Sequence, residues 1–175
     1  NSIFADNKDS RIIVATFASN VDRVQQIINS AYTYGRKVIV EGRSMVSVIN
    51  TAAELGIINI PDNTLIDIEQ INDYPEEKTV IVTTGSQGET MAALSRIATN
   101  THRKVSLNQG DVVIFSSNPI PGNEKAVSKV INELSMKGAD VIFQDAHVSG
   151  HACEEEIKLI YSLVKPKYSI PVHGE

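Results

Sequence analysis

The stretch Thr79–Ala98, TVIVTTGSQGETMAALSRIA, decides the fold class. Its first five residues are apolar or β-branched without alternation, which is the pattern of a strand buried on both faces of a parallel sheet. Two glycines then end the strand, and Met91, Leu94 and Ala98 follow at helical spacing. A strand, a short glycine loop and a helix form one βα unit, so the stretch predicts an α/β fold.

The same alternation of strand and helix extends in both directions along the chain. Further strands are expected at Arg11–Phe17, Lys37–Gly42, Asp111–Ser117, Asp140–Gln144 and Tyr168–Gly174, with a weaker one around Leu65–Glu69. Pro171 inside the last of them is typical of an edge or crossing strand. The repeated order predicts a doubly wound, mainly parallel sheet flanked by helices.

Five helices are expected between these strands, because apolar residues recur there with the helical period. Their apolar stripes lie within Val21–Ala31, Met45–Leu55, Met91–Ala98, Val127–Leu134 and Ile157–Val164. Ser19 is expected to cap the first helix, while Gly56, Gly138 and Pro166 end the second, fourth and fifth. The first ten residues are polar and are expected to be a frayed linker.

Composition limits the class of protein. The 175 residues, 42% of them hydrophobic, are enough for one domain with its own core. A net charge of −5 weighs against a general basic nucleic-acid surface, although it leaves room for a local phosphate site. Six acidic residues between Asp62 and Glu77 have no Lys or Arg among them, so this stretch is expected to be solvated and to lie away from any polyanion.

Cysteine content and hydropathy indicate the compartment. The single cysteine, Cys153, fits a reducing, cytoplasmic setting. No apolar run reaches the roughly 18 residues of a membrane span, and no signal peptide is recognisable, so no membrane contact is expected.

Four loops of small polar residues are expected at the carboxyl ends of strands, where open α/β sheets bind ligands. They are EGRSM (41–45), TTGSQGET (83–90), SSNPIPGNE (116–124) and DAHVSGHA (145–152). Gly85 and Gly88 permit close backbone approach, helix N-termini offer N–H groups to an anion, and Arg43 can bind a phosphate bidentately. Each loop alone is also a common βα connection, and none is a P-loop or a Gly-x-Gly-x-x-Gly motif.

Three of the four histidines lie in the last thirty residues. His147 and His151 bracket Ser149 and Gly150, which favours a functional loop running into a helix start over a metal-binding helix. His173 is uninformative on its own. His102 stands beside a basic pair and is expected at the surface.

Four motifs in order, TTGSQGETMAALSRIA, GDVVIFSSNPIPGNE, HVSGHA and LVKPKYSIPVHGE, resemble the ribonuclease J family. This is a group of RNA-processing enzymes in the β-CASP branch of the metallo-β-lactamase superfamily. The resemblance runs from about Arg11 to Glu175. The chain departs from the family pattern at Thr90, where proline is expected, and at Ala152, where glycine is frequent.

The resemblance implies roles for the candidate residues. His151 would act in RNA cleavage, by stabilising the scissile phosphate or as a general acid, and His173 would bind one of two catalytic zinc ions. His147 and Ser149 would contact the RNA phosphate backbone. The loops at the strand ends are expected to complete this RNA-phosphate-binding wall with Gly150, Gly85, Ser86, Gln87, Arg43 and Asn123. By the same resemblance, residues 11–165 form a Rossmann-like β-CASP domain and residues 166–175 a strand returning to a metallo-β-lactamase domain.

The sequence lacks the H-x-H-x-D-H motif with which the family holds its metals. The chain is therefore expected to be the β-CASP part of a zinc-dependent 5′-exo/endoribonuclease of RNA processing and decay, inactive alone and, when intact, a homo-oligomer or a complex with a paralogue. Two alternatives remain open: a non-catalytic RNA- or nucleotide-phosphate-binding module of a poorly active paralogue, and a free-standing nucleotide-binding domain.

Overall fold

The computed structural model describes residues 2–143, 152 and 154–170. In this part of the chain, five strands form one all-parallel sheet in the order β2-β3-β1-β4-β5. The strands are β1 (Ile12–Ala15), β2 (Lys37–Glu41), β3 (Thr79–Thr83), β4 (Val112–Phe115) and β5 (Asp140–Ile142). The predicted α/β fold is confirmed, and each of the five strands lies inside its predicted range.

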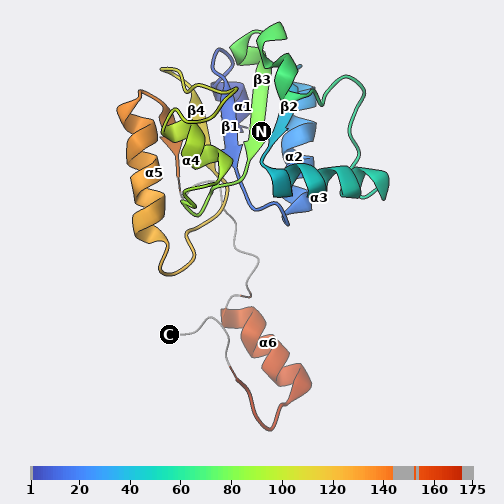
Figure 1. The fold of residues 1–175 in the computed structure, drawn as a ribbon. Helices are drawn as coiled ribbons and strands as arrows, with labels where there is room; N and C mark the ends of the chain where they lie inside the picture. The colour runs from blue at the N-terminus through green and yellow to red at the C-terminus, as the bar shows by residue number, and fades with distance from the viewer. Residues whose placement is uncertain (1, 144–151, 153, 171–175) are drawn as a thin grey trace.

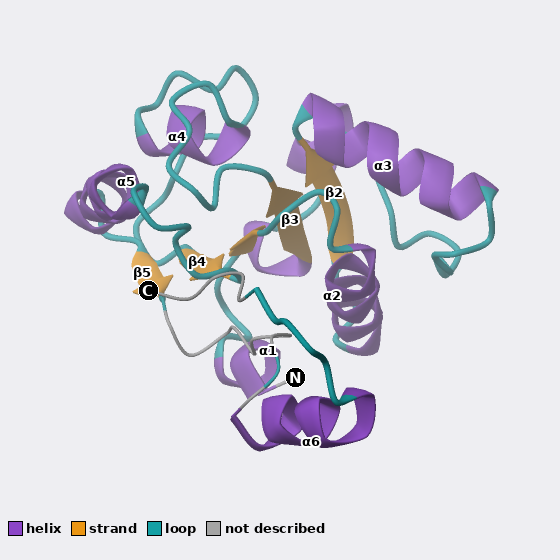
Figure 2. Ribbon diagram, turned by 90° about the horizontal axis from the view of Figure 1, so that it is seen from below, coloured by secondary structure: helices purple, strands orange, loops and turns teal. Residues whose placement is uncertain are grey.

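Helices cover both faces of the sheet (Figures 1 and 2). On one face, α1 (Ser2–Asp6), α2 (Val21–Thr33) and α3 (Arg43–Glu54) pack against one set of strand side chains, which includes Ile12 and Val14. On the other, α4 (Ala93–Ala98) and α5 (Glu124–Met136) pack against the alternate set, which includes Ile13 and Ala15. Burial on both faces explains why the strand sequences show no polar alternation.

The segment around Leu65 runs along the outer edge of β2. Leu65 makes an isolated parallel bridge with Val38, and the Ile66 N–H donates to the Val38 carbonyl at 2.9 Å. Pairing stops there because Asp67 and Gln70 form a capping box that starts the 3-10 helix η1 (Ile68–Asp73), followed by η2 (Glu76–Lys78). The weaker strand expected at Leu65–Glu69 is therefore one bridge followed by a helical turn.

The N-terminal residues, expected to be frayed, instead contact the domain. Phe4 of α1 is buried, its ring stacks on that of Tyr34 with centroids 5.9 Å apart, and the Arg36 guanidinium lies 5.8 Å from the Phe4 centroid. Arg36 also donates to the carbonyl of Ser10 at 2.7 Å. An aromatic residue and a buried arginine thus tie down a stretch whose composition is polar.

Two helix starts differ from the prediction. Asn20, not Ser19, caps α2, since its side-chain oxygen accepts the Arg23 N–H at 3.1 Å. Helix α4 begins at Ala93, so Met91 precedes it and is 84% exposed rather than packed in the core. The loop from Gly85 to Ala92 uses the residues that were expected to form its first turn.

The last helix, α6 (Glu154–Val164), has the predicted position but buries none of its residues. Figure 1 draws it apart from the sheet. Residues 168–170 form no strand, and the rest of the strand expected at Tyr168–Gly174 lies outside the described residues. None of the described helices is long and apolar enough to cross a membrane.

Candidate phosphate-binding cleft

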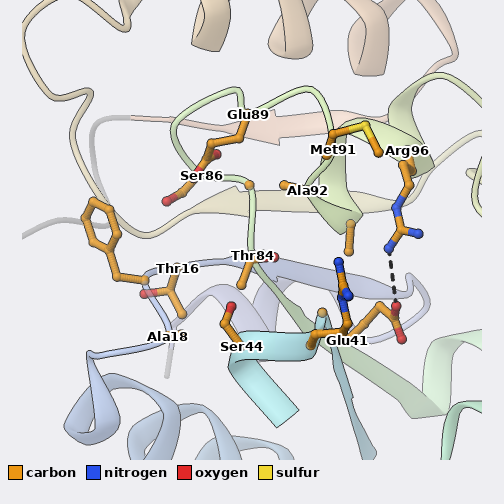
Figure 3. A pocket seen from close by; sticks show the side chains of 15 residues that line it. Thr16, Ala18, Glu41, Ser44, Thr84, Ser86, Glu89, Met91, Ala92 and Arg96 are labelled. Carbon is orange, nitrogen blue, oxygen red and sulfur yellow. Dashed lines mark ion pairs between the residues drawn. The ribbon is translucent and has the colours of Figure 1, made fainter. Parts of the chain in front are cut away.

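A cleft of about 790 Å³ opens where β1, β2 and β3 end (Figure 3). Its walls come from the loops that follow these strands and from the first turns of α3 and α4. The lining residues are Thr16, Phe17, Ala18, Glu41, Gly42, Arg43, Ser44, Thr84, Gly85, Ser86, Glu89, Met91, Ala92, Ala93 and Arg96. This is the edge at which parallel α/β sheets bind ligands.

The N-terminus of α3 forms one wall of the cleft. Its N-cap is Gly42, with φ of 106° and no side-chain hydrogen bond to the first turn. A Cβ at Gly42 would lie 2.7 Å from Oγ1 of Thr84, so the position requires glycine both for φ and for space. Because no side chain caps the helix, the N–H groups of its first turn are available to an anion in the cleft.

Two buried hydroxyl groups line the cleft without a hydrogen-bond partner. Within the described residues, Oγ1 of Thr16 and Oγ of Ser86 make no hydrogen bond, although each residue is only 1% exposed. A buried polar group left unpaired costs about 1–3 kcal/mol. Such groups, which most native proteins avoid, fit a site whose ligand supplies the missing partner.

Three of the predicted phosphate-binding residues meet in this cleft. Arg43 lines it with an exposed side chain, and Gly85 and Ser86 also line it. Gly85 has φ of 110°, and a Cβ there would lie 2.9 Å from Cβ of Leu94. The glycine therefore lets β3 turn sharply enough to bring Ser86 against the cleft.

Gln87 and Asn123 lie beside the cleft and do not line it. The Gln87 side chain donates to the Asn118 carbonyl at 3.0 Å and accepts the Ile120 N–H at 2.7 Å. Asn123 contacts the same carboxamide oxygen at 3.4 Å. Gln87 thus joins the loops after β3 and β4, which confirms that these two loops share one edge of the sheet.

The remaining predicted site residues lie outside the described residues. They are His147, Ser149, Gly150, His151 and His173. Their roles stay predictions. The loop that carries the first four follows β5, whose carboxyl end is at the same edge of the sheet as the cleft.

Residues 9–134 match the family model of the ribonuclease J β-CASP domain. The chain belongs to the ribonuclease J family. Residues 139–175 match a second model, described as the Zn-dependent metallo-hydrolase RNA specificity domain. The two models divide between α5 and β5, so the loop with the predicted catalytic histidine falls in the second match.

Among curated ribonucleases J, the chain is 45% identical to ribonuclease J2 of Bacillus subtilis, over 97% of this chain and 31% of that protein. It is 48% identical to ribonuclease J of Synechocystis over 95% of this chain and 27% of that protein. For ribonuclease J 1 of Streptococcus pyogenes the identity is 51%, over 94% of this chain and 30% of that protein. The chain therefore spans about a third or less of the length of these relatives.

Three residues that the sequence did not predict as part of the site form a cluster at the end of β2: Glu41, Arg96 and His102. His102, expected at the surface, has a side chain only 4% exposed, with Nε2 3.0 Å from Oε1 of Glu41. Arg96 Nη2 lies 3.7 Å from the same oxygen. The surface prediction for His102 is wrong because the loop after α4 folds its imidazole back against the end of β2.

The acidic stretch between Asp62 and Glu77 lies outside the cleft, since none of its acidic residues lines it. It is not free of positive partners, however. Lys104 pairs with Glu69, and Arg11 Nη1 lies 3.7 Å from Oε1 of Glu76. The basic partners that the sequence lacks locally come from distant segments.

The described part of the chain does not supply a zinc site. No three His, Cys, Asp or Glu side chains within it are close enough together to hold a metal ion. The predicted ligand His173 is outside it.

Proposed function

We propose that this chain supplies the RNA-phosphate-binding wall and the catalytic histidine of a zinc-dependent ribonuclease that acts from the 5′ end and internally, in RNA processing and decay. One observation carries the proposal: two buried, unpartnered hydroxyls lie beside an uncapped helix N-terminus in a cleft at the carboxyl ends of three strands. The curated relatives, which are named ribonucleases J, support RNA as the substrate.

In this proposal one RNA phosphate sits on the floor of the cleft. The first-turn N–H groups of α3 and the hydroxyls of Thr16 and Ser86 donate to its oxygens, and the fork of Arg43 binds the same phosphate from the exposed side. Such a site needs no net positive charge, because aligned N–H groups and hydroxyls act at short range. It is therefore compatible with a chain of net charge −5.

The second part of the proposal concerns the histidines. His151 stabilises the scissile phosphate or protonates the leaving oxygen, His147, Ser149 and Gly150 contact the RNA backbone, and His173 is a zinc ligand. Support comes from the position of β5, whose carboxyl end lies at the edge of the sheet that carries the cleft. Gln87 and Asn123 are assigned to positioning the loops, since their carboxamides contact each other and the loop after β4.

The chain alone is proposed to be inactive, and the intact protein to act in the cytoplasm as a homo-oligomer or a complex with a paralogue. Helix α6 supports a further protein surface, because Leu163 and Val164 are 74% and 68% exposed on an apolar helix. We propose that its partner is the metallo-β-lactamase domain of the same protein. A labelled 5′-monophosphate RNA incubated with the 175-residue chain and zinc, manganese or magnesium should stay intact.

The phosphate site is tested by binding in the full-length protein carrying His151→Ala, so that the RNA is not cleaved. Ser86→Ala and Arg43→Gln should each weaken binding of a 5′-phosphorylated single-stranded RNA by about tenfold, the loss of one good hydrogen bond to a charged group. Ser44→Ala is the variant to compare with Ser86→Ala, because Ser44 also lines the cleft but has an exposed side chain. Unchanged affinity in both variants would contradict the assignment of the cleft.

A further inference from the structure

Arg96 lies on the side of the cleft away from the unpartnered hydroxyls. Figure 3 shows its guanidinium reaching from α4 toward Glu41, while Thr16 and Ser86 lie at the other end of the cleft. The side chain of Arg96 is 40% exposed, and its Nε is buried without a partner in the described part of the chain. A partly exposed arginine with unused donors therefore faces the space proposed for the RNA.

Glu41 holds this arginine loosely. Arg96 Nη2 lies 3.7 Å from Oε1 of Glu41, well beyond the 2.7–2.9 Å of a saturated arginine–carboxylate pair. A guanidinium has five N–H donors in a fixed plane. One loose contact orients that plane and leaves most of its donors for another oxygen ligand.

His102 in turn fixes Glu41. Nδ1 of His102 accepts the backbone N–H groups of Val105 at 3.1 Å and Lys104 at 3.3 Å, so its proton is on Nε2. Nε2–H then donates to Oε1 of Glu41 at 3.0 Å. Because the imidazole is almost fully buried, the carboxylate has one preferred position at the end of β2.

We propose that Arg96 is a second phosphate-binding arginine of the cleft, and that Glu41 and His102 are the residues that position it. The proposal rests on the function assigned to the cleft above. It also accounts for a carboxylate in a site for a polyanion. Oε1 of Glu41 is bound by His102 and Arg96, so Glu41 directs the Arg96 guanidinium at the RNA. A carboxylate without these partners would repel the RNA phosphates.

The salt dependence of RNA binding tests the role of Arg96. In the full-length His151→Ala protein, Arg96→Gln should weaken binding of a 5′-phosphorylated single-stranded RNA about tenfold. It should also lower the slope of log K against log salt by about 0.7, the value for one phosphate contact on a single strand. Arg103→Gln is the matched control, because Arg103 is exposed beside His102 and does not line the cleft. Its slope should not change.

His102→Phe separates positioning from general stability. The substitution removes the N–H that donates to Glu41 without removing a charged group. It should nevertheless weaken RNA binding about threefold and lower the salt slope, because the contact of Arg96 with the phosphate is lost in part. In an Arg96→Gln background the same change should have no further effect, which is the signature of coupled residues. His102→Gln, which keeps an N–H donor, should restore part of the affinity, and thermal unfolding of each variant reports whether it folds.

The outcomes distinguish the two proposals. If Arg43→Gln and Ser86→Ala weaken binding while Arg96→Gln leaves affinity and slope unchanged, the cleft is correct and the role of Arg96 is wrong. If none of the three changes binding, the cleft assignment itself fails. If His102→Phe weakens binding equally with and without Arg96, His102 does not act through the arginine.

Discussion

Helices α5 and α6 have similar apolar patterns, but α5 buries its apolar residues and α6 buries none. In α5, Val127, Val130 and Leu134 are buried against the sheet. In α6, no residue is buried, and Ile160 and Leu163 are 52% and 74% exposed. An amphipathic stripe specifies a helix that needs a partner, but it does not say where the partner is. Most of the buried core lies in the β-CASP match, whereas α6, in the second family match, presents an apolar surface.

The two regions also differ in whether their residues contribute mainly to stability or to catalysis. The sheet region contains the buried core and the cleft, and the C-terminal segment contains the predicted catalytic and metal-binding histidines. Changes to the buried core of the first region should therefore act mainly on folding, and changes to the histidines of the second mainly on activity.

In the full-length protein, His151→Ala should lower single-turnover RNA cleavage by about 10²–10⁴-fold, the range for loss of a general acid or base. Its metal content should remain near that of the unchanged protein. His173→Ala should lower metal content as well as cleavage. Elemental analysis measures the metal content of both variants, and quenched-flow assays measure their cleavage rates. Loss of metal from the His151 variant alone would mean that His151 is the metal ligand and His173 the catalytic residue.

Asp111→Ala should destabilise the sheet region by about 3–5 kcal/mol, the cost of leaving one partner of a buried ion pair uncompensated. Asp111 is 3% exposed and accepts from Nε of Arg11 at 3.1 Å and from the backbone N–H of Asn108 at 2.8 Å. Urea unfolding measures the change. Asp62→Ala, at an exposed aspartate, is the control and should have little effect.

Leu134→Ala and Leu163→Ala compare the two helices directly. Leu134 is fully buried, so its truncation should cost about 2–5 kcal/mol. Leu163 is 74% exposed, so in the 175-residue chain its truncation should change stability by less than about 0.5 kcal/mol. In the full-length protein, Leu163→Ala should lower stability by more than it does in the 175-residue chain. Equal effects in both proteins would show that α6 has no partner there.

Asn20→Ala should have the smallest effect, about 1 kcal/mol, because it removes the side-chain cap of α2 and leaves its packing intact. Asn20→Ser should recover most of the loss, since serine caps helices about as well as asparagine. Thermal unfolding of the three proteins compares them. A Ser19→Ala variant should be neutral, because Ser19 is exposed and Asn20 is the capping residue.

Most of the fold follows from local sequence. Runs such as Ile12–Ala15 and Thr79–Thr83 are apolar or β-branched throughout, and this alone indicates buried parallel strands. Strand order does not follow from such runs, because it depends on which distant segments pair. The exposed Met91 shows the limit for helices, since a periodic apolar residue can belong to a loop that precedes the helix.

The candidate site was predictable only in part. Arg43, Gly85 and Ser86 were identified because they follow strands directly, and strand ends meet at one edge of a parallel sheet. The contact of Glu41 with His102 joins residues 61 positions apart, and no local pattern indicates it. The sequence placed Gln87 correctly in the loop after β3. Only its contacts show that its carboxamide joins this loop to the loop after β4.

The central place of β1 has a consequence for synthesis of the protein. Both neighbours of β1 come from much later in the chain, since Ile12 pairs with Val80 and with Val112. A ribosome adds about 5–20 residues per second, so β1 waits roughly 5–20 s for its second neighbour. Both edges of this fully apolar strand are open until β3 is made, and one edge stays open until β4 is made; such open edges are the surface on which nascent chains aggregate. We expect this protein to depend on chaperones that shield its first strand until β4 has left the ribosome.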